Sequence, residues 1–435
     1  MLQLRPGRTA LPNRPGHYLG QSKTLLQKRQ ERGKEMIIEG NILIRQGITY
    51  GQVEIKNQKI IRVGAVKQKP DIILKEKQAL SPLLYDSHVH LRDLEQTSRE
   101  TIKTGTAHLA STGVIECSAM PNTKPPLDNH QTLKQYLKLI NSDAEIKVNV
   151  YGLLTPNSYI EELERMQEYC NKKYKAFQAE SIGSGFFTNN EKLKDRILLL
   201  PENAEIRIHC EDPDTLKKHK HKWKQSKPRT HIKARPAKAE AKGIRYITEK
   251  IMPLRPDLKY FICHVSSWKG LRVIKKAKKR YDNLYCEAAY HHLYFSKKDY
   301  KDKGVKMKCN PSIKKKQNKR MLIRGLKNGL IDCLVSDHAP HTLEDKIKNN
   351  FSGLPSYDAG VFGWLVKKCR KQSHYQHLLK AATKPEYEIR EGNKAAMMIL
   401  NLEGKLVKAE DQETKAGKIS PYNNEVLPYI ETIIK

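Results

Sequence analysis

The stretch Leu83-Leu84-Tyr85-Asp86-Ser87-His88-Val89-His90 decides the fold, because it joins an apolar run to two histidines that are one residue apart. Side chains along a β-strand point to alternate faces, so His88 and His90 leave the same face of a strand that ends here. Imidazole is a common zinc ligand, and a catalytic zinc site keeps one coordination position open for water. The stretch therefore predicts a strand whose end contributes two ligands to a metal site.

Further apolar runs follow this one, separated by segments of helical character. They predict eight strands, at Leu83–His90, Val114–Ala119, Ile146–Gly152, Tyr174–Phe177, Ile206–His209, Tyr260–His264, Leu284–Ala288 and Asp332–Asp337. Ser266-Ser267 followed by Leu271, Ile274 and Ala277 predicts a capped helix with one apolar face. Repeated β-then-α units predict a parallel sheet with crossover helices. Eight units predict an α/β fold of the (β/α)₈ TIM-like barrel type, with its active site at the carboxyl ends of the strands.

The two ends of the chain predict a small β-domain beside this barrel. Short strands at 37–44, 52–55 and 59–63 need a partner face, and the apolar residues 426–434 offer one. We therefore expect residues 36–81 and 401–435 to form the small β-domain and residues 82–400 to form the metal-dependent barrel.

Residues 1–35 carry eight Lys or Arg, two Glu and three prolines, without an apolar stretch of signal-peptide type. This composition predicts a basic, disordered extension. A targeting peptide, or a translation start at Met36, would account for the same residues.

Charge, apolar runs and cysteine positions limit the class of protein. The formal charge is +34, from 81 basic and 47 acidic residues. Nucleic-acid binding is one interpretation, but lysine is spread along the whole chain, so we favour a solvated lysine-rich surface whose field attracts small anions. No apolar run approaches the length of a membrane helix. The eight cysteines form no C-x-x-C pair and several lie in apolar runs, which indicates buried thiols and a cytoplasmic location.

Ligand-type side chains recur at equivalent ends of the predicted strands. The first strand ends with the histidine pair, and the later ones bring Lys175, His209, His264 and Asp337. Each of these alone is more often a structural or solvated residue. Barrel closure would bring all of them to one rim, so their agreement favours a shared site.

At this point the motifs carry a family resemblance. Asp86-Ser-His-Val-His-Leu-Arg92 resembles the metal-binding entry motif of the amidohydrolase superfamily, and Met120-Pro-Asn-Thr-Lys-Pro-Pro126 is similar to a segment typical of dihydroorotases. Further matches occur in the family's order, at residues 209–212, 262–266, 286–293 and 331–342. The resemblance runs from about Met36 to the C-terminus. Departures occur at residues 93–96 and 353–360, in loops near the expected site.

The resemblance implies two zinc ions per chain, bridged by an N-carboxylated lysine. The implied metal ligands are His88, His90, Lys175, His209, His264 and Asp337. Zinc would activate a bridging hydroxide, and Asp337 would act as the catalytic general base and acid. A lysine is a poor ligand as a cation, with a pKa near ~10.4, and burial favours the neutral amine that takes up carbon dioxide.

The family reaction interconverts dihydroorotate and N-carbamoyl-L-aspartate in pyrimidine synthesis. The implied substrate-binding residues are Arg92, Asn122, Asn310 and His341. A guanidinium fork matches a carboxylate, which suits this substrate.

Two other functions stay open. One is another cyclic-amide hydrolase, such as an allantoinase or a dihydropyrimidinase. The other is a non-catalytic dihydroorotase-like scaffold. As partners we expect a small-molecule substrate, a possible homodimer and, by family analogy, aspartate transcarbamoylase, but neither nucleic acid nor a membrane.

Overall fold

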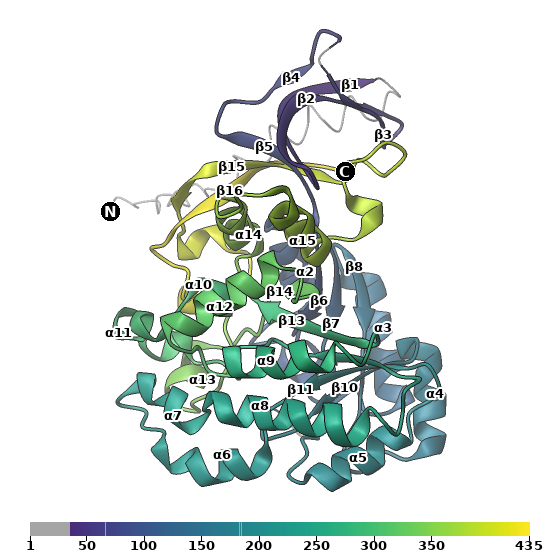
Figure 1. Ribbon diagram of the computed structural model, residues 1–435, viewed down its shortest axis with the longest axis vertical. Coiled ribbons are helices and arrows are strands. Elements are labelled where there is room, and N and C mark those ends of the chain that lie inside the picture. The colour runs from purple at the N-terminus through teal and green to yellow at the C-terminus, as the bar shows by residue number, and fades with distance from the viewer. Residues whose placement is uncertain (1–34, 66, 182, 184) are drawn as a thin grey trace, which may run out of the picture.

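The computed structural model describes residues 35–65, 67–181, 183 and 185–435. A sheet that contains β1–β3 lies at one end of the molecule, and a larger body of strands and helices lies below it (Figure 1). The disordered extension expected at residues 1–35 falls on 1–34, outside the described residues.

The end sheet joins strands from both ends of the chain. Its strand order is β16-β15-β5-β1-β2-β3, and β4 pairs with β1. Asn57 and Gln58 both have positive φ, as a tight turn between β2 and β3 requires. The strands are β1 (Met36–Ile44), β2 (Gly47–Lys56), β3 (Lys59–Gly64), β4 (Ile72–Ile73), β5 (Gln78–Pro82), β15 (Met397–Leu406) and β16 (Val426–Ile434).

The larger body contains the strands predicted from the apolar runs, and their mutual pairing is parallel. One sheet has the order β6-β7-β8 and another the order β14-β13-β12-β11-β10-β9. The third predicted strand is divided into β8 and β9, which belong to different sheets. The strands are β6 (Leu84–Val89), β7 (Val114–Ala119), β8 (Lys147–Val150), β9 (Gly152–Leu153), β10 (Lys173–Phe177), β11 (Glu205–His209), β12 (Lys259–Ile262), β13 (Leu284–Ala289) and β14 (Cys333–Val335).

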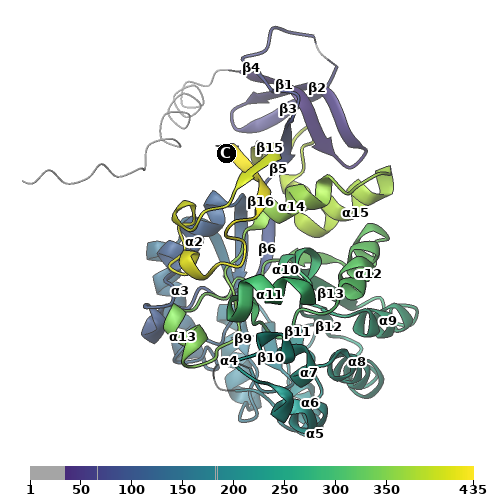
Figure 2. The same ribbon diagram turned by 90° about the vertical axis from the view of Figure 1, so that its left-hand side faces the viewer.

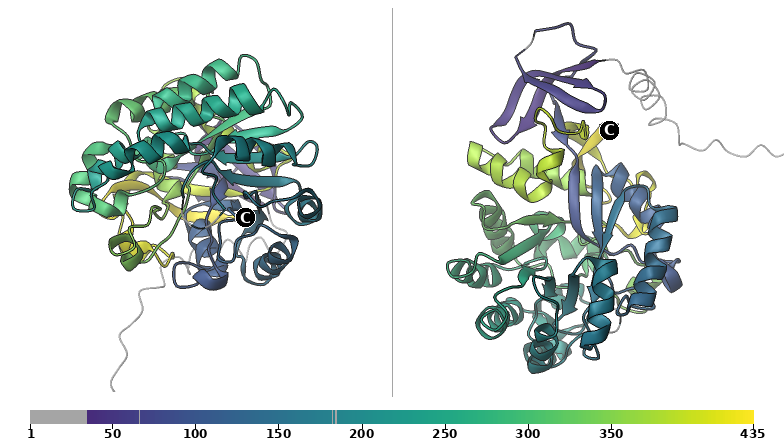
Figure 3. Two further views of the ribbon diagram at one scale, coloured as in Figure 1. Left: turned by 90° about the horizontal axis from the view of Figure 1, so that it is seen from below. Right: turned by 90° about the vertical axis from the view of Figure 1, so that its right-hand side faces the viewer.

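Helices surround these parallel strands, as the view from below shows (Figure 3, left). The predicted helix after Ser267 is confirmed: Ser267 caps α9 by accepting a hydrogen bond from Gly270 N, and Leu271 and Ile274 are buried. The helices are α2 (Ile102–Ser111), α3 (His130–Asp143), α4 (Ile160–Cys170), α5 (Asn190–Leu198), α6 (Pro213–His219), α7 (His231–Ala234), α8 (Ala237–Tyr246), α9 (Trp268–Ala277), α10 (Tyr290–Tyr294), α11 (Tyr300–Lys303), α12 (Lys316–Lys327), α13 (Leu343–Ile347), α14 (Asp358–Val366) and α15 (Gln372–Ala382).

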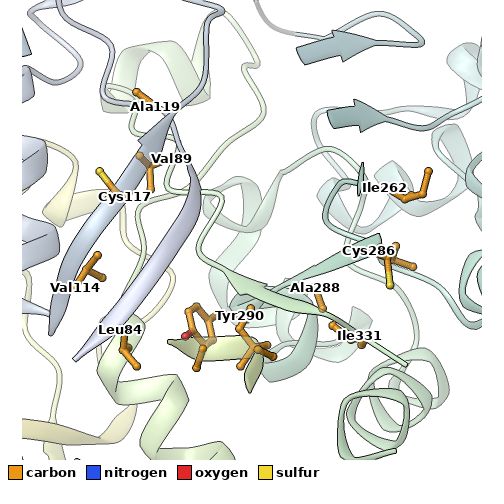
Figure 4. Close-up of a cluster of buried hydrophobic side chains, with 14 of the residues drawn as sticks. Leu84, Val89, Val114, Cys117, Ala119, Ile262, Cys286, Ala288, Tyr290 and Ile331 are labelled. Carbon is orange, nitrogen blue, oxygen red and sulfur yellow. The ribbon is translucent and has the colours of Figure 1, made fainter. Parts of the chain in front are cut away.

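Helices α14 and α15 lie between the end sheet and the larger body (Figure 2). The hydrophobic core of the body gathers side chains from strands far apart in sequence, among them Val89 on β6, Cys117 on β7 and Ala288 on β13 (Figure 4). Strands buried on both faces are typical of parallel sheets covered by helices. This core fixes the strand ends from which the site is built.

The first and last strands of the body also meet. Val89 at the end of β6 forms a parallel bridge with His338, three residues after β14, and His90 N donates to His338 O at 2.7 Å. The loop after β14 therefore lies beside the histidine pair. All eight cysteines are free thiols, as predicted. Among the described residues, no helix combines the length and the apolar character needed to cross a membrane.

Candidate active site

The end of β6 and the loop after β14 bring together two histidines and an aspartate. His90 Nε2 lies 3.1 Å from Asp337 Oδ1, and His88 Nε2 lies 3.6 Å from the same oxygen. All three side chains are buried, and their ligand atoms lie within 4.8 Å of one another, close enough to hold one metal ion. Asn122 Oδ1 lies 2.6 Å from His90 Nδ1 and accepts its proton, so the nitrogen that faces Asp337 is left as a free ligand.

A second pair of histidines comes from β11 and the residue two positions after β12. His209 Nδ1 lies 3.2 Å from His264 Nε2, and the His264 ring centroid lies 5.1 Å from that of His88. Glu211 Oε2 lies 3.0 Å from His209 Nε2, which fixes the proton there and leaves Nδ1 free. The four imidazoles therefore form one continuous group at the carboxyl ends of parallel strands.

Lys175 lies among these rings and is fully buried. Its Nζ lies 3.5 Å from His88 Nε2, donates to Cys263 Sγ at 3.0 Å and lies 4.9 Å from the centroid of the Phe177 ring. Among the described residues, no carboxylate forms an ion pair with it. The amine therefore lies enclosed among the imidazole rings, a thiol and an aromatic ring.

Burial lowers the pKa of all four imidazoles. The pKa lies well below its usual range for His88 and His264, where neighbouring cations and rings add to the effect of burial. Burial alone would raise the pKa of Asp337, but the contact with His90 and the charges of His90, His291 and Lys175 together outweigh it, and the pKa is lowered. Neutral imidazoles and an ionised carboxylate are the forms that bind metal.

The backbone is strained at several of these positions. Arg92, His264 and Asp337 have φ of 59°, 32° and 49°, which non-glycine residues rarely adopt. Such strain persists only where the surrounding structure determines it, and it gathers at functional sites.

The predicted substrate-binding residues lie beside the metal-type cluster. One pocket is lined by His90, Arg92, Asn122, Phe177, Ser181, His209, His264, Asn310, Asp337, Ala339, Ser352 and Gly353. His341 is behind Arg92, with its Nε2 3.2 Å from Arg92 Nη2 and 3.1 Å from Ser352 O. The structure thus brings the four residues together with the six expected ligands.

Arg92 determines the charge of the ligand that this pocket is suited to bind. The side chain is buried, and burial lowers its pKa to about 10. Its Nε donates to Pro340 O, while Nη1 is buried and has no hydrogen-bond partner among the described residues. A buried guanidinium with a spare donor, on the wall of a pocket, is suited to an anionic ligand.

Sequence reasoning missed the residues that orient the ligands. Glu287 Oε2 lies 2.8 Å from His88 Nδ1, and Arg235 Nε donates to Glu211 Oε2 at 2.8 Å. Glu287 stands inside an apolar strand, where a buried acid needs partners, and Glu211 shares a face with His209 two residues before it. These two features of the sequence could have identified Glu287 and Glu211 as residues that orient the ligands.

The donor set fits a metal ion. Besides His88, His90 and Asp337, two other buried groups within the described part of the chain come close enough to hold a metal: His88, Cys263 and Glu287, and His291, His292 and Cys309. His264 Nδ1 is buried and has no hydrogen-bond partner there, so this imidazole has an unused ligand atom. Imidazole nitrogen and carboxylate oxygen are the ligands that catalytic zinc sites use.

Comparison with known proteins agrees with this geometry. Residues 77–269 match the model of the family described as dihydro-orotase-like. The chain carries a dihydro-orotase-like domain. Similarity to curated dihydroorotases extends further: 28% identity over 355 residues with that of Fusobacterium nucleatum (78% of this chain and 82% of the relative), and 29% over 394 residues with that of Pyrococcus abyssi (88% and 89%).

Solved structures share the fold of this chain. An L-hydantoinase from Arthrobacter aurescens aligns with a TM-score of 0.77 at 19% identity, over 92% of this chain and 95% of that one. A dihydropyrimidinase from Brevibacillus agri aligns with a TM-score of 0.76 at 18% identity, over 91% and 93%. At this identity the likeness concerns the fold, which is mixed α/β with parallel sheets.

Proposed function

We propose that the protein is a dihydroorotase, which reversibly hydrolyses the cyclic amide of dihydroorotate to N-carbamoyl-L-aspartate. The observation that carries this proposal is the pocket in which Arg92, Asn122 and Asn310 face the buried histidine cluster. The substrate has a carboxylate for the guanidinium and an amide bond for the metal-type cluster. The dihydroorotase relatives of similar length support the same reaction.

We further propose two zinc ions as the cofactor. His88, His90 and Asp337 would hold one, His209 and His264 the other, and Lys175 would bridge them as an N-carboxylated side chain. Support comes from the burial of Lys175, from the lack of an ion pair between it and any carboxylate in the described part of the chain, and from the proximity of its amine to His88. When bound, zinc activates water at neutral pH and polarises a carbonyl.

The residues of the chain perform the remaining steps. Arg92 and Asn122 hold the substrate carboxylate and fix the ring, so that its amide carbonyl faces the imidazole cluster. Asp337 Oδ1 lies 3.1 Å from His90 Nε2, and the carboxylate would take a proton from the attacking water and return it to the leaving amide nitrogen. In the reverse direction the same carboxylate removes that proton.

The test is a coupled measurement of metal content and turnover on the purified chain. We expect about two zinc ions per chain and ring opening of dihydroorotate, with ring closure of N-carbamoyl-L-aspartate in the reverse direction. Intact mass under non-denaturing conditions reports the added carboxylate on Lys175. A metal-loaded enzyme that turns over neither substrate contradicts the proposal.

A substrate panel separates this function from the alternatives. Allantoin and dihydrouracil lack the carboxylate that Arg92 is suited to bind, so we expect them to be poor substrates. Preference for either one would assign the chain to another class of cyclic-amide hydrolase. Inactivity towards the whole panel would favour a non-catalytic scaffold.

We also propose that the parallel strands close into a (β/α)₈ barrel, with residues 82–400 as the barrel and 36–81 and 401–435 as the small β-domain. Support comes from the Val89–His338 bridge between the first and last strands and from the sheet that both chain ends share. A cytoplasmic location, a homodimer and an association with aspartate transcarbamoylase complete the proposal, the last by analogy alone.

A further inference from the structure

A long stretch beside the candidate site contains no acidic residue. From Thr215 to Ala239 the chain has ten Lys or Arg and three His, and no Asp or Glu. We call residues 215–239 the basic segment; it covers most of α6, all of α7 and the start of α8. Its exposed cations are Lys217, Lys218, Lys220, Lys222, Lys224, Lys227, Arg229, Lys233 and Lys238.

The basic segment packs against the loops that line the pocket. His231 Nε2 donates to Cys309 O at 3.0 Å, next to Asn310. Gln225 donates to Ile347 O at the end of α13, before the loop that leads to Ser352 and Gly353. Lys220 pairs with Glu180 at 2.8 Å, next to Ser181. The segment therefore contacts the chain neighbours of two pocket-lining residues, Asn310 and Ser181, and the helix that precedes Ser352 and Gly353.

Nearby acids do not cancel this charge. Glu180 is already paired with Lys220, and Glu211 is paired with Arg235. Asp212 is paired with Lys242, which lies outside the basic segment. Asp214, the exposed residue directly before the segment, offsets at most one more cation. Most of the nine exposed Lys and Arg side chains therefore keep their charge, and the electrostatic potential on this side of the pocket is positive.

We propose that the basic segment attracts the anionic substrate to the pocket and lowers its KM through long-range charge. This inference rests on the proposed function, since it assigns the segment to the same substrates. Exposed charges act over a Debye length of about 8 Å at physiological salt and about 30 Å at 0.01 M, so the effect is largest at low salt. Coulomb energy is linear in charge, so N-carbamoyl-L-aspartate, with two carboxylates, gains about twice as much as dihydroorotate, with one.

The test removes four exposed charges without touching the pocket. The test variant combines Lys217→Gln, Lys218→Gln, Lys222→Gln and Lys224→Gln. The control variant removes the same number of charges from the exposed lysines of the far sheet, with Lys67→Gln, Lys69→Gln, Lys75→Gln and Lys77→Gln. Figure 1 shows β3 and β4 at the end of the molecule opposite α6 and α7.

At about 10 mM ionic strength we expect the test variant to raise KM for N-carbamoyl-L-aspartate about five-fold, with kcat unchanged. The change in log KM for dihydroorotate is half as large, and both changes vanish near 0.5 M salt. The control variant leaves KM unchanged.

An active enzyme whose KM is the same in the test variant overturns this inference and leaves the proposed function intact. So does an equal loss in the control variant, or a loss that salt does not remove. If KM of the test variant stays constant while its binding of a short single-stranded oligonucleotide weakens, the basic segment binds nucleic acid and the inference is wrong. An inactive wild type overturns both proposals.

Discussion

Glu287 Oε2 lies 2.8 Å from His88 Nδ1 and fixes the proton on that nitrogen, so that Nε2 is presented to Lys175 and Asp337. The carboxylate is fully buried and also pairs with Arg207. A carboxylate behind a histidine ligand sets its tautomer and raises its basicity. The relationship makes Glu287 an orienting residue of the metal-type cluster.

We therefore expect Glu287→Gln to weaken zinc binding by about 10- to 100-fold, because the amide is a poorer acceptor for the His88 proton. Competition with a chelator, read as metal content, measures the loss. Glu205→Gln is the matched control, since Glu205 also pairs with Arg207 but touches no ligand. Equal losses in both variants would mean that the effect comes from Arg207 and the strand.

Asp337→Asn tests the proton-transfer role. The amide keeps the size of the side chain but cannot take a proton from water, so we expect kcat to fall by about 10²- to 10⁴-fold, while KM changes little. Steady-state kinetics in both directions, on samples of equal zinc content, measure this. A kcat close to that of the wild type at full metal occupancy would contradict the role.

Periodicity identified much of this site. Each of the eight predicted runs contains a strand, and the ligand-type residues lie on or near the carboxyl halves of strands. Side-chain alternation is a local property, and the repeat of β-then-α units predicts the parallel arrangement. The sequence did not identify Glu287 as the partner of His88, since the pair is 199 residues apart and the two residues lie on strands of different sheets, β13 and β6. The division of the third strand at Tyr151 was missed for the same reason: it reflects a change of neighbouring strand.

Arg92→Lys tests carboxylate recognition. Lysine keeps the charge but loses the fork, so we expect KM for dihydroorotate to rise about 10- to 100-fold, the equivalent of one charged hydrogen bond, with a smaller effect on kcat. Arg99→Lys is the control, because Arg99 pairs with Asp345 and does not line the pocket. A lower kcat at constant KM would place Arg92 in the chemical step instead.

Lys346 predicts a pH dependence of stability. Its amine is fully buried, donates to Lys308 O at 2.8 Å and to Gly353 O at 2.5 Å, and burial lowers its pKa from 10.5 to about 7. Between about pH 7 and pH 10.5 the unfolded chain binds more protons than the folded chain. The contribution of Lys346 to the free energy of unfolding therefore rises with pH in this range and is lost as the pH falls towards 7.

Lys346→Met removes this titration. We expect the difference in the free energy of unfolding between wild type and Lys346→Met to change in favour of the wild type by up to about 1.4 kcal/mol per pH unit above pH 7. Urea unfolding at a series of pH values measures it, and subtraction cancels the other titrating groups. Lys348→Met is the control, because Lys348 is exposed and pairs with Glu344. A pH-independent difference for Lys346→Met would show that the amine stays charged in the folded chain, held by the two carbonyls.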